Sequence, residues 1–228
     1  MKPQTVAIDG PAGAGKSTVA RLLAAQLGFL YVDSGAMYRA VALKVRENAI
    51  DPADETAVAM LARTVRIVFV PGDTADAEQG VHVDGSDVTT AIRVPEIASL
   101  ASVVSAIPGV RSALVTQQQA LGTQGGVVME GRDIGTVVFP HAEVKVFLTA
   151  SPDERAVRRH KDILSRGVDT TIDAVRADQD ERDGRDASRA VSPLTVAPDA
   201  LEISSDGKTP EQIVGEILRH IETLRSEG

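Results

Sequence analysis

The sequence predicts an α/β protein in which a parallel five-stranded sheet carries helices on both faces. Short apolar runs rich in β-branched residues alternate with longer segments whose apolar residues recur at helical spacing. A glycine-rich loop also joins the first apolar run, Thr5-Val6-Ala7-Ile8, to a segment in which Val19, Leu23 and Leu27 share one helical face. Strands separated by helices run parallel, and right-handed connections place those helices on both faces of the sheet.

The other elements follow from the same alternation. Gly28 is expected to end the first helix, and a second helix is expected from Asp33 to about Glu47. The last helix is expected after Thr209-Pro210-Glu211-Gln212, a capping box with proline at the first helical position. The five expected strands span residues 5–8, 29–32, 126–130, 144–148 and 201–203.

Two segments do not fit this alternation. Residues 64–90 hold three short β-like pieces, at 65–70, 81–83 and 88, which predicts a small antiparallel insert. Residues 151–190 carry eight arginines and almost no apolar periodicity, which indicates helices on the surface.

Composition limits the partners that the chain could bind. The net charge of −8 argues against general attraction to nucleic acid or anionic lipid, and four Phe, two Tyr and no Trp leave few platforms for base stacking. The absence of Cys excludes disulfides and thiol catalysis. The uncharged apolar run Ile97–Val110 is too short and too polar to cross a bilayer. We therefore expect a cytoplasmic protein that binds neither nucleic acid nor membrane.

The loop between the first strand and the first helix matches the phosphate-binding pattern G-x-x-x-x-G-K-[ST]. Its backbone N–H groups and the following helix N-terminus would hold a polyphosphate. Lys16 would reach the β- and γ-phosphates, and the Ser17 hydroxyl would ligate Mg²⁺. A glycine-rich structural turn that ends in a helix cap is the alternative. The residues expected to bind ATP are Gly10, Pro11, Ala12, Gly13, Ala14, Gly15, Lys16, Ser17 and Thr18.

Arginines in the segment 151–190 are spaced to share helix faces. Arg155, Arg158 and Arg159 form one set, and Arg182, Arg185 and Arg189 form another. Next to a phosphate-binding loop, such a segment is a candidate lid that closes over the polyphosphate and excludes water. The acidic residues among them allow an alternative, a solvated helix pair held by salt bridges.

Two further segments follow expected strands, at the edge where α/β sheets place their ligands. Asp33–Arg39 opens a helix, with Ser34 as a candidate cap and Arg39 one turn on. Gly131–Thr136 presents Arg132 and Asp133 between glycines, although an Asp-containing turn is the commoner reason for such a sequence.

Taken together, these motifs resemble those of bacterial cytidylate kinases, which are P-loop nucleoside monophosphate (NMP) kinases that phosphorylate CMP and dCMP. The resemblance covers essentially the whole chain. It rests on four blocks in the same order: residues 10–17 (GPAGAGKS), 33–39 (DSGAMYR), 131–140 (GRDIGTVVFP) and 181–194 (ERDGRDASRAVSPL). Two positions depart from the family pattern, because Thr149 and Glu130 stand where the family has Asp.

The resemblance implies three regions and a role for each site residue. The P-loop core would comprise residues 1–34, 111–151 and 191–228, the NMP-binding region residues 35–110 with the β insert 64–90, and the lid residues 152–190. Ser102, Arg111 and Asp133 would contact cytosine, and Arg182 and Asp186 the ribose. Arg39, Arg132 and Arg189, with Ser34 nearby, would hold the acceptor phosphate. The residues expected to serve phosphoryl transfer itself are Lys16, Arg132, Arg158 and Arg189.

The chemistry of the substrates agrees with these roles. Asp133 would accept a hydrogen bond from the cytosine amino group, whereas uracil presents a carbonyl oxygen there. The acceptor phosphate is largely ionised at neutral pH, so in-line transfer needs no general base, only alignment and charge screening by Lys16, Mg²⁺ and arginines. We expect ATP and CMP or dCMP as substrates, Mg²⁺ as cofactor and a monomeric enzyme.

Three alternatives belong to other functional classes. A kinase of small hydroxyl metabolites would use Asp33 as a base, but would not explain the arginines on the acceptor side. A GTPase switch would need an Asn/Thr-Lys-x-Asp segment, and residues 147–152 (FLTASP) offer none. A nucleic-acid-binding module is disfavoured by the net acidity.

Overall fold

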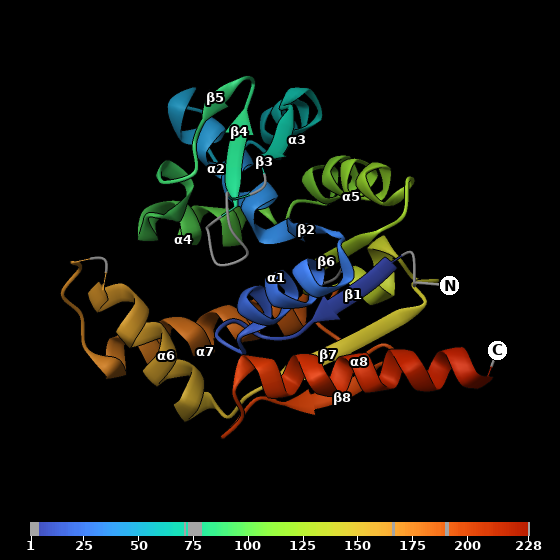
Figure 1. Ribbon diagram of the computed structural model, residues 1–228. Helices are drawn as coiled ribbons and strands as arrows, with labels where there is room; N and C mark the ends of the chain where they lie inside the picture. The colour runs from blue at the N-terminus through green and yellow to red at the C-terminus, as the bar shows by residue number, and fades with distance from the viewer. Residues whose placement is uncertain (1–4, 71, 73–78, 166, 190–191, 228) are drawn as a thin grey trace.

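The computed structural model describes residues 5–70, 72, 79–165, 167–189 and 192–227. It contains a parallel five-stranded sheet in the order β2-β6-β1-β7-β8 (Figure 1). The strands are β1 (Thr5–Asp9), β2 (Leu30–Asp33), β6 (Val127–Gly131), β7 (Val144–Thr149) and β8 (Leu201–Ser204). All four pairings between neighbours are parallel, so the predicted fold class is confirmed.

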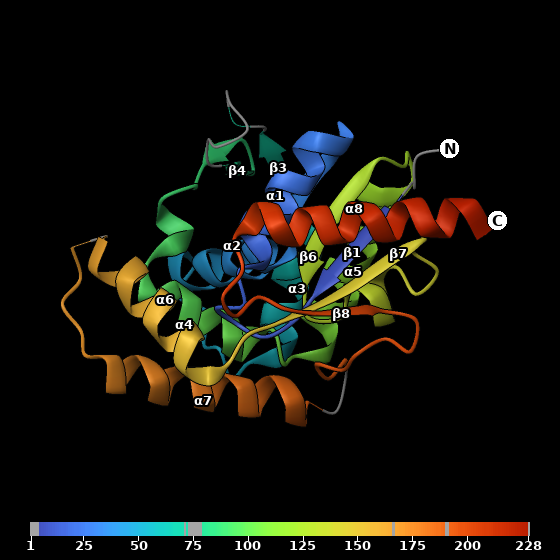
Figure 2. The same cartoon turned by 60° about the horizontal axis from the view of Figure 1, so that its bottom comes forward.

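Helices cover both faces of this sheet (Figures 1 and 2). On one face, α1 (Lys16–Leu27) and α8 (Pro210–Glu227) bury their apolar residues against β1, β7 and β8. On the other face, α5 (Pro108–Gly122) and the short π-helix η2 (Ile134–Val138) pack over β1 and β6. Residues on both faces of β1 are fully buried, as is usual for parallel sheets covered by helices.

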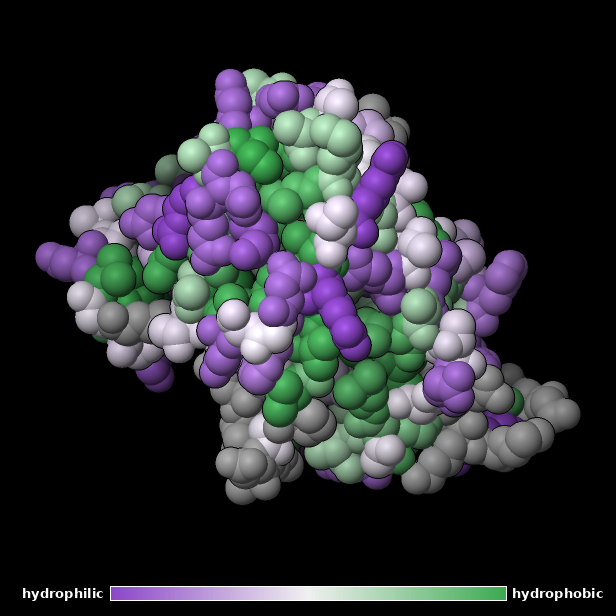
Figure 3. Space-filling view, turned by 90° about the horizontal axis from the view of Figure 1, so that it is seen from above, coloured by the Kyte–Doolittle hydropathy of each residue, from purple (hydrophilic) through white to green (hydrophobic). Residues whose placement is uncertain are grey.

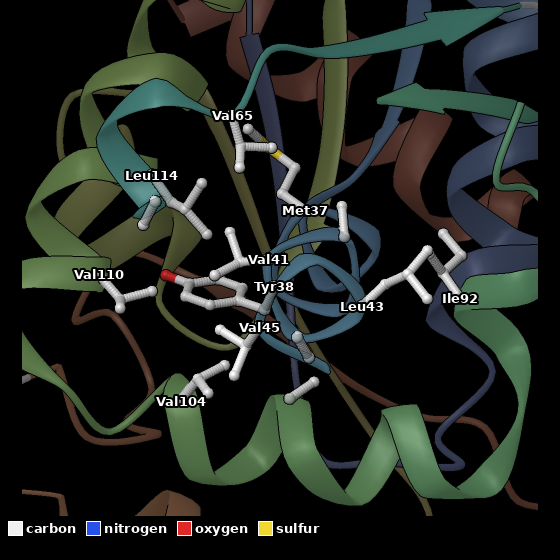
Figure 4. Close-up of a cluster of buried hydrophobic side chains, with 14 of the residues drawn as sticks. Met37, Tyr38, Val41, Leu43, Val45, Val65, Ile92, Val104, Val110 and Leu114 are labelled. Atoms are coloured by element: carbon white, nitrogen blue, oxygen red, sulfur yellow. The ribbon is translucent and has the colours of Figure 1, made fainter. Parts of the chain in front are cut away.

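A second hydrophobic core lies above the sheet, within residues 36–114 (Figure 4). Met37, Tyr38 and Leu43 of α2 occupy its centre and meet side chains from the surrounding helices. The elements around it are α2 (Ser34–Glu47), α3 (Glu55–Thr64), η1 (Ala91–Arg93), α4 (Pro95–Val104), part of α5, and the strands β3 (Ile67–Val70), β4 (Gly80–Val83) and β5 (Ser86–Asp87). The five main strands contribute no buried residue to this core, because its residues all lie between β2 and β6 in the sequence.

The predicted β insert is confirmed as an antiparallel sheet of β3, β4 and β5. Its third strand lies at 86–87 rather than at Val88, and its first begins at Ile67 because Val65 is the C-terminal cap of α3. Residues 71 and 73–78 of the predicted insert lie outside the described residues.

The charged segment forms two helices, α6 (Pro152–Ser165) and α7 (Ile172–Ser188), which project to one side of the molecule (Figure 2). Seen from above, their tip forms a lobe in which hydrophilic and hydrophobic residues are mixed (Figure 3). Residues 166 and 190 of the predicted lid, and 190–191 of the fourth sequence block, lie outside the described residues.

Among the described helices, none is by itself both long and apolar enough to cross a membrane. Only α4 and α5 taken together pass on length and composition, and they are bent by 102° at the break between them.

The parallel sheet brings the predicted motifs to a single edge. Asp9, at the end of β1, lies beside Gly131 of β6 and Phe147 of β7, and Asp33 of β2 lies beside Glu130. The loops that follow these strands are the phosphate-binding loop, the start of α2, the Arg132-Asp133 segment and the start of the lid. Because parallel strands all point the same way, four segments distant in sequence converge there.

We expect Leu114→Ala to destabilise the protein by about 2–5 kcal/mol, because Leu114 is fully buried between α5 and the second core and its removal leaves a cavity. Urea unfolding followed by circular dichroism would measure this change. Leu224→Ala is the matched control, since Leu224 of α8 is exposed and its truncation should cost little. Equal losses in the two variants would contradict the packing described here.

Candidate active site

The phosphate-binding loop lies between β1 and α1, as predicted, and contains six of the nine residues expected to bind ATP. Gly15 has a left-handed backbone (φ 90°) directly before the helix. Gly13 is also left-handed, and a Cβ there would lie 3.0 Å from the Cβ of Arg155 in the lid. The other three expected residues, Lys16, Ser17 and Thr18, lie in the first turn of α1, where Ser17 and Thr18 are exposed. The loop therefore presents a helix N-terminus and two hydroxyls to the edge of the sheet.

Lys16 is buried, and its Nζ donates to the carbonyl oxygen of Pro11 at 2.7 Å. The pKa of Lys16 is lowered to about 7, chiefly by burial and also by the positive charges of Arg132 and Arg182, against the opposing effect of Glu130. A cation held in this environment gains strongly from a nearby anion.

The predicted phosphate-holding arginines are gathered around two aspartates. Arg132 donates to Asp186 Oδ2 at 2.8 Å, and Arg189 pairs with the other oxygen of the same carboxylate. Burial opposes ionisation of Asp186, but Arg132 and Arg189 outweigh it and hold its pKa below the usual value. Arg39 pairs with Asp33 at 2.7 Å.

Arg182 is the least compensated cation of the group. Burial lowers its pKa to about 10, and the neighbouring charges of Arg132 and Arg39 contribute to the same shift. Within the described part of the chain, the buried Nε atoms of Arg39, Arg182 and Arg189 have no hydrogen-bond partner. Unpaired buried donors of positive charge fit the oxygen atoms of phosphate groups.

The residues expected to read the base also meet. Arg111 pairs with Asp133, and both side chains are almost completely buried. Arg111 also lies 5.6 Å from the ring centre of Tyr38 and donates to the Ser105 carbonyl oxygen at 3.3 Å. A cation–π contact with Tyr38 and two polar partners thus hold the guanidinium in one orientation.

Ser102, the third residue expected to read the base, lies at the wall of a cavity between α4 and the lid. Its Oγ accepts a hydrogen bond from Arg185 at 2.9 Å. The cavity lies next to the arginine cluster because Arg182 also lines it. Its lining residues are Pro95, Ala98, Ser99, Ser102, Arg159, Ile163, Val168, Asp169, Thr170, Val175, Asp178, Arg182 and Arg185.

The lid touches the phosphate-binding loop directly. Arg155 is buried, donates to the Ala12 carbonyl oxygen at 3.0 Å and pairs with Asp183 at 2.6 Å. Arg158 donates to Ser205 Oγ at 2.8 Å, and a Cβ on Gly15 would lie 3.7 Å from its Nη1. Arg158 therefore lies close to the loop.

The charged segment shows features of both structures considered from the sequence, a solvated helix pair held by salt bridges and a segment that meets the phosphate-binding loop. Salt bridges do lace the helices, since Arg159 pairs with Asp162 at 2.8 Å and Arg185 with Glu181 at 3.4 Å. Yet Arg155 is buried, and Arg182 is half-buried at the wall of the cavity between α4 and the charged helices, so neither side chain is fully exposed to solvent.

The acidic groups near Ser17 have a distinct arrangement. Glu130 is buried and accepts a hydrogen bond from the Tyr31 hydroxyl at 2.7 Å, and it also interacts with Ser17. Burial raises the pKa of Glu130, and Asp33 raises it further. No cluster of three or more His, Cys, Asp or Glu suited to a metal ion occurs among the described residues. Mg²⁺ commonly takes only one or two protein ligands together with substrate phosphates, so a hydroxyl beside one carboxylate fits such an ion.

One sequence-based prediction is wrong. Ser34 does not cap α2, because Asp33 occupies the cap position and accepts a hydrogen bond from the Ala36 N–H at 3.1 Å. The Ser34 hydroxyl instead donates to the Glu130 carbonyl oxygen at 2.6 Å. A carboxylate one residue earlier was available to the helix, which left the hydroxyl free to bind the neighbouring strand.

Sequence reasoning also missed three residues that organise the site. They are Asp9, Tyr38 and Ser105. Tyr38 lies within a motif that the sequence did single out. Asp9 and Ser105 had no local signal, since their partners lie on other elements.

The fold and the site together define a P-loop phosphotransferase, in which a glycine-rich loop, a buried lysine and an arginine-bearing lid meet at the edge of a parallel sheet. A family model described as cytidylate kinase matches residues 6–223, nearly the whole chain. The chain belongs to the cytidylate kinase family.

Curated relatives agree over the same length. The cytidylate kinase of Limosilactobacillus reuteri is 46% identical over 223 residues, covering 97% of this chain and 96% of that protein. A bifunctional pantoate ligase/cytidylate kinase of Synechococcus sp. is 51% identical over 210 residues, which cover 92% of this chain and 42% of that longer protein. The predicted activity is thereby confirmed: the chain is an enzyme that transfers a phosphoryl group from ATP to CMP or dCMP.

Among solved structures, an uncharacterised protein from Eubacterium ventriosum has a TM-score of 0.51 at 11% identity. The match covers 96% of this chain and 98% of that one. At this identity the likeness concerns the fold alone.

We expect Lys16→Met to change how stability depends on pH. The pKa of Lys16 is about 7 in the folded protein and 10.5 when unperturbed, so between these values the unfolded chain binds the proton more tightly. In the absence of nucleotide, the free energy of unfolding should therefore rise with pH from about pH 7 to pH 10 in the unmodified protein, and rise less in the variant. Urea unfolding at several pH values would measure both slopes, and parallel slopes would contradict the buried environment of Lys16.

Proposed function

We propose that this enzyme transfers the γ-phosphoryl group of ATP in line to an oxygen of the CMP phosphate, without a general base. The carrying observation is the cluster formed by buried Lys16 with half-buried Arg132 and Arg182, whose positive charges repel one another. Two polyanions repel each other in the same way. A site that gathers cations therefore lowers the cost of bringing them end to end.

In this proposal each nucleotide has its own cationic partners. The ATP phosphates lie on the backbone of residues 10–18 and on Lys16. The acceptor phosphate is held by Arg39, Arg132 and Arg189, whose present partners are carboxylates that an anion could replace in part. Arg182 and Asp186 hold the ribose, and Ser34 lies nearby. The acceptor oxygen is already ionised at neutral pH, so no residue needs to remove a proton.

Arg158 would serve the transferring phosphoryl group once it leaves Ser205. Its guanidinium is already beside the loop, and its pairs with Glu154 and Ser205 are partly exposed. Partly exposed pairs of this kind contribute little stability, so the exchange of partners costs little.

Cytosine would be recognised by Asp133, Arg111 and Ser102. The Asp133 carboxylate accepts from the amino group of cytosine, and Arg111 donates to the ring acceptors. Against uracil, the same buried carboxylate would face a carbonyl oxygen, at a cost of several kcal/mol. The almost complete burial of Arg111 and Asp133 supports this discrimination, because little water can compensate the mismatch.

Mg²⁺ would be held by the Ser17 hydroxyl, with the Glu130 carboxylate beside it, and would screen the charge that develops on the transferring oxygens. Thr149, at the end of β7, supplies no carboxylate for such a site.

The three regions implied by the resemblance are part of the proposal. The five-stranded core, the region at 35–110 with its own hydrophobic core, and the lid at 152–190 would move relative to one another as the nucleotides bind. One chain supplies all the residues proposed for both nucleotides, which supports a monomer. ATP and CMP are metabolites of the cytoplasm, which supports action there.

Initial rates with ATP and Mg²⁺ against CMP, dCMP, UMP and AMP would test this proposal. CMP and dCMP should have a higher kcat/KM than UMP, because cytosine offers an amino donor to Asp133 and an acceptor to Arg111, whereas uracil presents a carbonyl oxygen to Asp133. Equal rates with UMP would contradict the proposed base recognition.

We expect Asp133→Ala to lower kcat/KM for CMP by roughly a hundredfold, and kcat/KM for UMP much less, because only CMP loses a hydrogen bond to the buried carboxylate. Steady-state kinetics with the two acceptors would measure the difference, and UMP serves as the internal control. Equal losses would remove Asp133 from base recognition.

A further inference from the structure

Asp133 stands at the N-cap position of the π-helix η2, yet its side chain makes no capping hydrogen bond. An aspartate at this position commonly accepts hydrogen bonds from the first free N–H groups of its own helix. Here the carboxylate is paired with Arg111 instead. The first N–H groups of η2 must therefore be satisfied by another residue.

Asp9 supplies that partner from a different strand. Its Oδ1 accepts from the Ile134 N–H at 2.8 Å, and its Oδ2 accepts from the Gly135 N–H at 2.7 Å. The Asp9 side chain is buried, and both of its oxygens are used. Asp9 is also the last residue of β1 and directly precedes the phosphate-binding loop.

From this geometry we infer that Asp9 is a positioning residue for base recognition: by capping η2 in place of Asp133, it keeps the Asp133 carboxylate free for the acceptor base. Both carboxylates lie close enough for the charge of Asp133 to act on Asp9. Without the Asp9 carboxylate, these two buried N–H groups would lose their acceptor, and the Asp133 side chain, at the N-cap position, would be free to take its place. Its rotation toward them would remove it from Arg111 and from cytosine.

This inference rests on the proposed role of Asp133 in reading the base, and it goes beyond that role. The effect of Asp9 on base preference can be separated from that of Asp133, because the Asp9 carboxylate accepts hydrogen bonds from the backbone N–H groups of Ile134 and Gly135. Asp9 would change the preference for CMP without contacting the nucleotide.

The test compares kcat/KM for CMP and UMP in Asp9→Asn, Asp133→Asn and Asp54→Asn. The Asn side chain has one acceptor oxygen and turns an NH₂ group toward the second N–H, so Asp9→Asn should lower the preference for CMP roughly tenfold. Most of that change should appear as a higher KM for CMP, and kcat for UMP should change little. Asp54→Asn is the matched control, because Asp54 caps α3 through the Ala57 N–H and lies outside the site.

Each outcome has a distinct meaning. A lower preference in Asp9→Asn but not in Asp54→Asn supports the inference. An unchanged preference in Asp9→Asn, together with a loss in Asp133→Asn, overturns the inference and leaves the proposed function standing. An unchanged preference in Asp133→Asn overturns the proposed base recognition, and the inference with it.

A measurement on the unmodified enzyme decides the matter if Asp9→Asn does not fold. Burial raises the pKa of Asp9 to about 6, the hydrogen bonds from Gly135 and Ile134 oppose that shift, and Asp133 and Lys16 are the charges that act on it. Lys145 of β7 packs against Gly135 nearby and is paired with Asp199.

The preference for CMP over UMP should fall as the pH is lowered through about 6, since protonated Asp9 loses one acceptor. The phosphates of CMP and UMP titrate alike, so the ratio cancels their contribution, and a constant ratio would overturn the inference.

Discussion

The mutual repulsion of Lys16, Arg132 and Arg182 is the constraint around which the other residues of the site are arranged. Buried Lys16 and half-buried Arg132 and Arg182 lie close together at the edge of the sheet, and desolvation together with neighbouring charges lowers the pKa values of Lys16 and Arg182. Such a cluster is unfavourable by itself. In the proposed mechanism, the phosphate groups of the nucleotides would relieve this repulsion when they bind.

Carboxylates keep this cluster compatible with a folded protein. Asp186 pairs with both Arg132 and Arg189, and Asp33 pairs with Arg39 while it also caps α2. These pairs hold the guanidinium groups near the positions where an anion would need them, and they leave other donors of the same groups free. In the proposed mechanism, the substrate would therefore meet arginines that are already oriented, which would reduce the entropy lost on binding.

Much of the site could be predicted because its motifs are local. Residues 10–18 identify the phosphate-binding loop, since the spacing of its glycines, lysine and serine reflects one backbone conformation. Arg132 and Asp133 could be singled out because they follow a strand directly. The prediction for Ser34 failed because Asp33, one residue earlier, is an equally good cap, and sequence does not rank two adjacent candidates. Asp9 and Ser105 escaped notice, because their contacts span 125 and 84 positions respectively.

By itself, the sequence determined the alternation of five strands with helical segments along the chain, the phosphate-binding loop, the antiparallel insert and the family to which the chain is similar. These properties arise from periodicity and from short motifs, which act over a few residues. Only the tertiary structure decided which carboxylate each arginine meets, that the lid docks on the loop through Arg155, and that Asp9 caps the helix that follows Asp133. Such choices depend on how parallel strands bring distant segments to one edge, and no local pattern records that convergence.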